Sequence, residues 1–178
     1  DEQTITEMTV EEQSTGELSI GVGYSSLEKT SVSFGIDERN FLGSGRALAL
    51  SLDFSQSRSN FRVGVAEPYL FGRNLTGRAG LFNQRTKQSS VTINKTGFDL
   101  GISFDAAKDY YHGVGYELSQ SKTTEKSTNA TSITGENGAQ ILTSAASYTV
   151  GQDRLDNRFD PTEGTLLELR QELAGIGG

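Results

Sequence analysis

An alternation of apolar and polar residues with a period of two is the feature that most constrains the fold of this chain. In residues 17–25, apolar side chains fill every even position from Leu18 to Tyr24, while glycine and polar residues fill the odd positions. Such alternation predicts β-strands with one apolar face, and no helical periodicity is sustained. It predicts about nine strands, over residues 17–25, 31–37, 47–55, 61–66, 75–83, 98–105, 112–119, 142–150 and 165–173.

The two faces of these predicted strands differ in side-chain size as well as in polarity. Branched aliphatic and aromatic residues gather on one parity, whereas glycine, serine and charged residues take the other. Hydrophobic residues make up only 34% of the chain, below the roughly 45–50% of soluble globular domains. Two all-β architectures fit: a soluble sandwich, whose apolar face forms the core, and an antiparallel membrane barrel, whose apolar face meets lipid.

The connections between the strands favour the membrane barrel. Those after the first and third strands are short and polar, and the one at 123–137 is long and rich in serine, threonine and asparagine. The connections after even-numbered strands each contain an aromatic residue, so one end of the sheet collects Phe41, Tyr69, Phe71, Tyr110, Tyr111 and Phe159. A belt of aromatic residues is typical of a membrane–water interface. We therefore predict an all-β, up-and-down transmembrane β-barrel.

Composition argues against several functional classes. The chain has no cysteine and one histidine, which removes disulfide frameworks, thiolate metal sites and most histidine-based catalytic sites. Its net charge of -7 argues against a nucleic-acid partner. Because no pairing of a nucleophile with a base stands out either, we expect neither enzymatic activity nor a cofactor or metal.

Polar residues at three kinds of position have structural interpretations. The group formed by Asp153, Asp156, Asn157 and Asp160 lacks the spacing of an EF-hand loop, so we predict a turn capped by aspartate and asparagine side chains. His112 begins a strand on the outward parity, which indicates an interfacial or surface histidine. The inward charges could pair between strands or line a solvated channel: Arg62, Arg78, Asp99, Asp105, Glu117, Glu168, Arg170 and Glu172.

Four runs of sequence resemble the Omp85-type outer-membrane assembly factors. Three lie near the start, TVEEQSTGELSIGVGYSS, FGIDERNFLGSGRALALSL and VGVAEPYLFGRNLTGRAGLF, and the fourth, YTVGQDRLDNRFDPTEGTLLEL, near the end. Their order and spacing agree with the family over nearly the whole chain. The NFLGSGR, EPYLFG and DPTEG turns are jointly fairly specific, although each alone is weak.

The resemblance implies a location, a domain organisation and partners. Family members carry periplasmic POTRA domains before a sixteen-stranded barrel in the bacterial outer membrane. We expect residues 1–13 to be the end of the last POTRA domain with its linker, and residues 14–178 to be the N-terminal half of the barrel. The implied partners are unfolded β-barrel clients, accessory subunits and outer-membrane lipid. Because exposed strand edges are costly in lipid, the remaining strands or another copy must cover the edges of this segment.

The resemblance also implies a site, because the barrels of this family open sideways between the first and last strands. An open edge offers unpaired backbone groups to a client strand, and Gly21 and Gly23 should make this edge easy to bend. The expected pairing residues are Glu17, Leu18, Ser19, Ile20, Gly21, Val22, Gly23, Tyr24 and Ser25. The alternatives are a secretion or translocation transporter of the same superfamily, a porin-like channel and a soluble β-sandwich adhesin.

Overall fold

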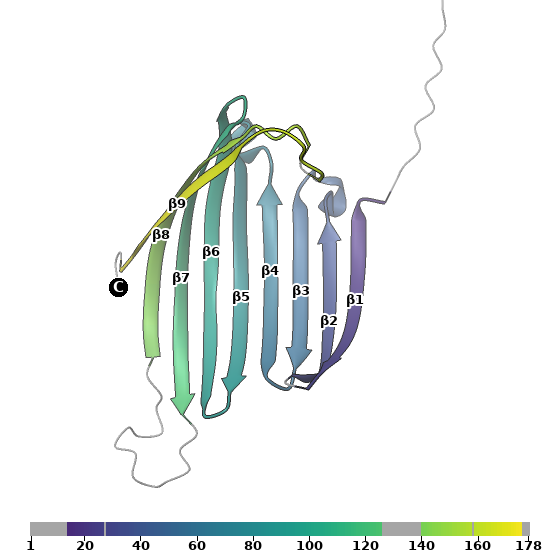
Figure 1. Ribbon diagram of the computed structural model, residues 1–178, viewed down its shortest axis with the longest axis vertical. Coiled ribbons are helices and arrows are strands. Elements are labelled where there is room, and N and C mark those ends of the chain that lie inside the picture. The colour runs from purple at the N-terminus through teal and green to yellow at the C-terminus, as the bar shows by residue number, and fades with distance from the viewer. Residues whose placement is uncertain (1–13, 27, 126–139, 158, 176–178) are drawn as a thin grey trace, which may run out of the picture.

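The computed structural model describes residues 14–26, 28–125, 140–157 and 159–175. There, nine strands form one antiparallel sheet in chain order, with β1 and β9 at its edges (Figure 1). The strands are β1 (Gly16–Ser25), β2 (Lys29–Glu38), β3 (Ala47–Ser55), β4 (Arg58–Glu67), β5 (Thr76–Gln88), β6 (Val91–Ala107), β7 (Tyr110–Glu125), β8 (Gln140–Asp153) and β9 (Leu166–Ala174).

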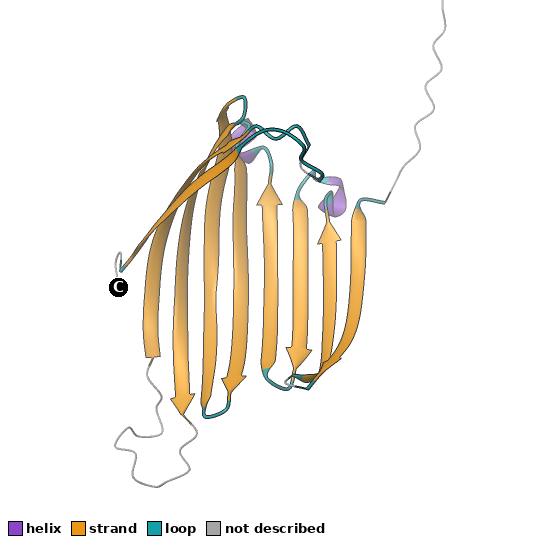
Figure 2. Ribbon diagram, viewed as in Figure 1, coloured by secondary structure: helices purple, strands orange, loops and turns teal. Residues whose placement is uncertain are grey.

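Helical structure in the described residues is confined to two 3-10 turns at one end of the sheet, η1 (Phe41–Gly43) and η2 (Leu70–Gly72) (Figure 2). No described helix has the length and apolar character needed to cross a membrane. Residues 1–13, predicted to end a POTRA domain, lie outside the described part of the chain.

The nine predicted strands are confirmed, but several are longer than predicted, and three of these illustrate the reason. β5 continues to Gln88, β6 begins at Val91, and β7 runs from Tyr110 to Glu125. The extensions at the far ends of β5 and β7 carry polar residues on both faces, and in β6 the apolar residues Val91 and Ile93 lie on the inward face. The outward apolar alternation that revealed the strands therefore disappears there. Most of the predicted connection at 123–137 lies outside the described residues.

The register keeps the apolar parity on one face across neighbouring strands. Ile20 pairs with Phe34, which in turn pairs with Leu52. This outward face is exposed: Leu18 is 63% exposed and Val22 is 76% exposed. No second layer of the described residues covers it, because all nine strands belong to one sheet. The sheet therefore matches the predicted barrel wall rather than the sandwich.

The inward face has its own packed centre around Phe82, the residue that breaks the alternation in 75–83. Its side chain is 3% exposed. The ring fits over Gly97, where an added Cβ would lie 2.8 Å from the ring Cζ atom. Arg62 and Lys95 approach the same ring, with the guanidinium carbon and the ammonium nitrogen 5.1 and 5.4 Å from its centroid. Phe82 thus joins β4, β5 and β6.

Several inward charges pair between strands around this centre. Arg62 Nη1 lies 2.8 Å from Asp99 Oδ1, so that the pair spans from β4 to β6 above β5. It can do so because Gly80 lies between them, where an added Cβ would be 2.8 Å from Asp99 Oδ2. Lys95 Nζ lies 2.7 Å from Glu117 Oε1 on β7. The inward charges therefore form ion pairs as well as lining the wall.

The aromatic residues at the η1 and η2 end divide between the two faces. Tyr111 turns inward, where it lies against Gly151 and donates a 2.6 Å hydrogen bond to Glu168. His112 faces outward as predicted: it stacks on Phe104 with 5.4 Å between ring centroids, and its Nδ1 lies 2.7 Å from the Tyr148 hydroxyl. Tyr111 is therefore not part of an outward belt.

Candidate functional site at the edge of the first strand

β1 contains every residue of the predicted pairing site and forms one edge of the sheet. It pairs only with β2 in this sheet, from Gly16 opposite Glu38 to Ser25 opposite Lys29. Its outward side chains are among the more exposed of the sheet, with Tyr24 75% exposed, because they have neighbours on one side only. Backbone groups along the other side of β1 are available to a further strand.

The inward face at this edge contains almost no bulky side chain. Glycine and serine alternate across the β1–β2 pair: Ser19 lies opposite Gly35, Gly21 opposite Ser33, and Gly23 opposite Ser31. An added Cβ at Gly23 would lie 2.9 Å from the Ser31 hydroxyl, so each serine occupies the space that its glycine partner leaves. On this face β1 lacks the ring and ion-pair contacts that join β4 to β7.

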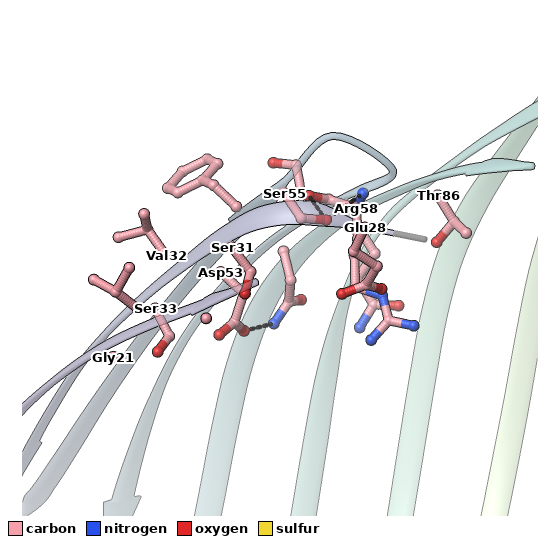
Figure 3. Close-up of a pocket in the computed structure, with 15 residues that line it drawn as sticks. Gly21, Glu28, Ser31, Val32, Ser33, Asp53, Ser55, Arg58 and Thr86 are labelled. Carbon is pink, nitrogen blue, oxygen red and sulfur yellow. Dashed lines mark hydrogen bonds between the residues drawn. The ribbon is translucent and has the colours of Figure 1, made fainter. Parts of the chain in front are cut away.

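A hollow of about 780 Å³ adjoins this edge on the inward side (Figure 3). Ser31, Ser33 and Asp53 contribute polar atoms to the hollow. Because Gly21 and Gly23 have no side chains, the β1 backbone itself lines the hollow at these positions. Asn60 Nδ2 donates a 2.9 Å hydrogen bond to Asp53 Oδ2, while Asn60 Oδ1 is buried and has no hydrogen-bond partner among the described residues. The hollow is thus lined by hydrogen-bonding groups of β2, β3 and β4 together with the charged residues Glu28, Asp53 and Arg58.

The start of β1 is tied to the η1 turn. The carboxylate of Glu38 accepts hydrogen bonds from the Thr15 hydroxyl and from the backbone N–H of Asn40. The backbone N–H of Arg39 donates to the Thr15 carbonyl at 3.1 Å. These bonds fix the N-terminal end of β1 against the η1 turn.

Turn η2 repeats the conformation of η1, which the sequence interpretation missed. Leu42 and Phe71 adopt left-handed backbone angles, with φ of 53° and 56°, and each precedes a glycine with positive φ. Bulky residues seldom adopt this conformation. A signal was present in the sequence: glutamate and glycine recur with equal spacing at 38 and 43 and at 67 and 72. Arg46 Nε also links the two turns through a 2.6 Å contact with Glu67 Oε2.

The β8–β9 connection is the capped turn that the acidic cluster predicted. The Thr162 hydroxyl donates to Asp156 Oδ2 at 2.6 Å, and the N–H groups of Thr162 and Glu163 donate to Oδ1. These bonds, that of the hydroxyl first, lower the pKa of Asp156 to about 2. The Asp156 carboxylate therefore stabilises the turn by accepting these hydrogen bonds. No group of three or more His, Asp or Glu side chains in the described residues is arranged to hold a metal ion.

Comparison with curated proteins finds relatives that are much longer than this chain. The chain is 29% identical over 178 residues to an outer membrane protein assembly factor BamA from Neorickettsia risticii, covering 98% of the chain and 24% of the relative. It is 29% identical over 171 residues to the protein of the same name from Nitratidesulfovibrio vulgaris, covering 95% of the chain and 22% of the relative. The chain therefore spans about a quarter of these relatives.

Comparison with solved structures supports the fold. The crystal structure of BamA from Haemophilus ducreyi lacking POTRA domains 1-3 matches with a TM-score of 0.72 at 20% identity, covering 93% of this chain and 35% of that one. A family model described as the Omp85 superfamily domain matches residues 40–178. That match includes most of the sheet, and the chain belongs to the Omp85 superfamily.

Proposed function

We propose that the protein containing this chain is an assembly factor that folds and inserts β-barrel proteins into the bacterial outer membrane. The names of the relatives support this activity, and the described sheet has the two-faced wall that a membrane barrel requires. Its substrates would be unfolded β-barrel clients. Accessory subunits of an assembly machine would be its protein partners.

The observation that carries the proposal is the contrast between β1 and the interior strands. β1 presents an edge with exposed apolar side chains outward and only glycine, serine and Glu17 inward. A client strand could pair with such an edge through backbone hydrogen bonds, which do not depend on the client sequence. The outward residues Leu18 to Tyr24 would hold the edge at the depth of the hydrocarbon.

Cysteine cross-linking tests the pairing directly, because residues 1–178 contain no cysteine. Single cysteines replace Ser19, Gly21 or Gly23 in the full-length protein, and a stalled client carries cysteines along its terminal strand. We expect disulfides to β1 in a single antiparallel register. Ser51→Cys serves as the control, since β3 already has a partner on each side. Equal cross-linking at Ser51→Cys, or insertion without any cross-link to β1, would refute the pairing.

The flexibility of the edge needs a separate test. We expect Gly21→Val combined with Gly23→Val to slow client insertion, because branched side chains stiffen β1 and fill the hollow beside it. Gly115→Val on β7 is the matched control, since an added Cβ there would lie 2.6 Å from the Ser147 hydroxyl, much as added Cβ atoms at Gly21 and Gly23 would meet serine hydroxyls at close range. Unchanged insertion in the β1 variant would show that glycine at the edge is dispensable.

A further inference from the structure

Strands β5, β6 and β7 continue past the apolar band of the outward face. Side chains on this face follow the pairing register, so each row can be read across the three strands. The last apolar row consists of Leu81, Phe98 and Leu118. The next row is polar and consists of Asn83, Thr96 and Gln120. Within this polar row, Asn83 Nδ2 donates a 2.6 Å hydrogen bond to Thr96 Oγ1. The outward face therefore changes from apolar to polar between two successive rows.

Basic side chains dominate the outward face directly beyond this boundary. Arg85 pairs with Asn94, which pairs with Lys122, and Lys87 lies two residues beyond Arg85 on the same strand. Gln84 and Thr86 line the inward hollow, so Arg85 and Lys87 between them point outward. Arg85, Lys87 and Lys122 form what we call the basic patch, with about 10 Å between β5 and β7.

The positive charge of this patch is not neutralised within the described residues. Arg46, Arg62, Lys95, Arg154 and Arg170 form ion pairs there, whereas the three patch residues form none. No outward position of β5, β6 or β7 in the described chain is acidic. Because the whole chain carries a net charge of -7, a cluster free of acids is not a consequence of its composition.

The first row of the patch lies within reach of lipid headgroups. This row is four residues beyond the last apolar row, which is about 13 Å along the strand. With the usual barrel tilt this is roughly 10 Å along the membrane normal. The headgroup region extends about 5–7 Å beyond the hydrocarbon on each side, and arginine and lysine side chains can bend back by several ångströms to reach it.

We propose that the basic patch binds the phosphate groups of a glycolipid in the external leaflet, of the lipid A type. The patch lies at the end of the sheet opposite Thr15 and the η turns. β7 ends on this side at Glu125 and β8 begins there at Gln140 (Figure 1). These strand ends are far apart in the sequence, and longer connections are typical of the external side of outer-membrane barrels. Two or three cations at these spacings fit a lipid carrying more than one phosphate.

Binding is tested with the full-length protein in detergent micelles, titrated with bis-phosphorylated lipid A and followed by native mass spectrometry. The patch variant combines Arg85→Gln, Lys87→Gln and Lys122→Gln. The control variant, Arg39→Gln with Arg73→Gln and Lys108→Gln, removes three exposed cations from the other end. Heat-modifiable gel migration confirms that both are folded. We expect roughly tenfold weaker binding or more for the patch variant, with the control variant unchanged.

Further arms identify the ligand chemistry. Dephosphorylated lipid A should bind the parent protein as weakly as lipid A binds the patch variant, and added salt should weaken parental binding. Phosphatidylglycerol binding as tightly as lipid A would overturn the glycolipid assignment. Equal losses in the two variants would overturn the site. Unchanged lipid binding, together with loss of a co-purifying acidic protein, would show that the patch serves a protein partner. None of these readouts depends on client insertion.

Discussion

Replacing Phe82 by alanine should destabilise the barrel more than any comparable change on its outward face. The ring is 3% exposed and is surrounded by Gly97 and the side chains of Arg62 and Lys95. Truncation of a buried phenylalanine costs about 3–5 kcal/mol. Of this, the two cation–π contacts account for roughly 1–2 kcal/mol, because both cations remain partly exposed. The expected loss is a large part of the roughly 5–15 kcal/mol that stabilises a typical domain.

The assay is urea unfolding of the full-length protein in detergent, followed by the loss of heat-modifiable migration. Phe159→Ala is the matched control, since Phe159 is 100% exposed in the turn between β8 and β9. Phe82→Leu preserves most of the apolar volume and should lose less than about 1.5 kcal/mol, which gives a measurable value if the alanine variant does not fold. A loss below about 1 kcal/mol for Phe82→Ala, or equal losses for Phe82→Ala and Phe159→Ala, would refute Phe82 as the centre of the inner wall.

Two more predictions concern a glycine and a carboxylate. Gly97→Ala should impair folding, because an added Cβ would lie 2.5 Å from the backbone oxygen of Leu118. Gly101→Ala should be tolerated, since the atom nearest to an added Cβ there is 3.7 Å away. Equal yields of heat-modifiable barrel from the two variants would contradict this prediction. The bonds to Asp156 hold its pKa at about 2, below the ordinary 3.8, so their stabilisation is complete above about pH 4 and is lost as the pH falls through 2. Hydrogen exchange at the Thr162 and Glu163 amides, corrected for intrinsic rates, should accelerate over this range, and Asp156→Ala should exchange fast throughout.

The sequence predicted the sheet because the period of two is strong wherever one face is apolar. It failed to predict the ends of β5, β6 and β7, where the outward face is polar and the apolar alternation that marks the strands is lost. It also left Phe82 unexplained, because a buried aromatic residue on the inward face depends on Gly97, which belongs to the neighbouring strand. Such a contact is set by register, and register between strands is not visible in one strand's own pattern.

The predicted site was defined by strand order and by Gly21 and Gly23. The pairing register between β1 and β2 explains why this edge is packed differently from the interior strands. Gly21 and Gly23 of β1 each face a serine of β2, so this edge has no bulky side chain that packs over a glycine as Phe82 packs over Gly97. The doubled turns η1 and η2 were missed for a different reason. Their left-handed residues, Leu42 and Phe71, are bulky, and sequence patterns predict positive φ mainly at glycine and asparagine.

The inward face of β4 to β7 and the edge strand β1 together suggest how one sheet can be stable in its interior and still accept a new partner strand at its edge. Phe82 and the ion pairs of Arg62 and Lys95 tie β4 to β7 through side-chain contacts, and the Arg62–Asp99 pair crosses β5. β1 is held to β2 by backbone pairing and outward apolar contacts, and at its start by the hydrogen bond from the Thr15 hydroxyl to Glu38 and that from the Arg39 N–H to the Thr15 carbonyl. If β1 accepts client strands as proposed, it can bend into the hollow beside Gly21 and Gly23 while the wall from β4 onward keeps its register. The strength of the wall would then be a condition for the mobility of the edge, since a sheet that yielded everywhere would lose the barrel along with the seam.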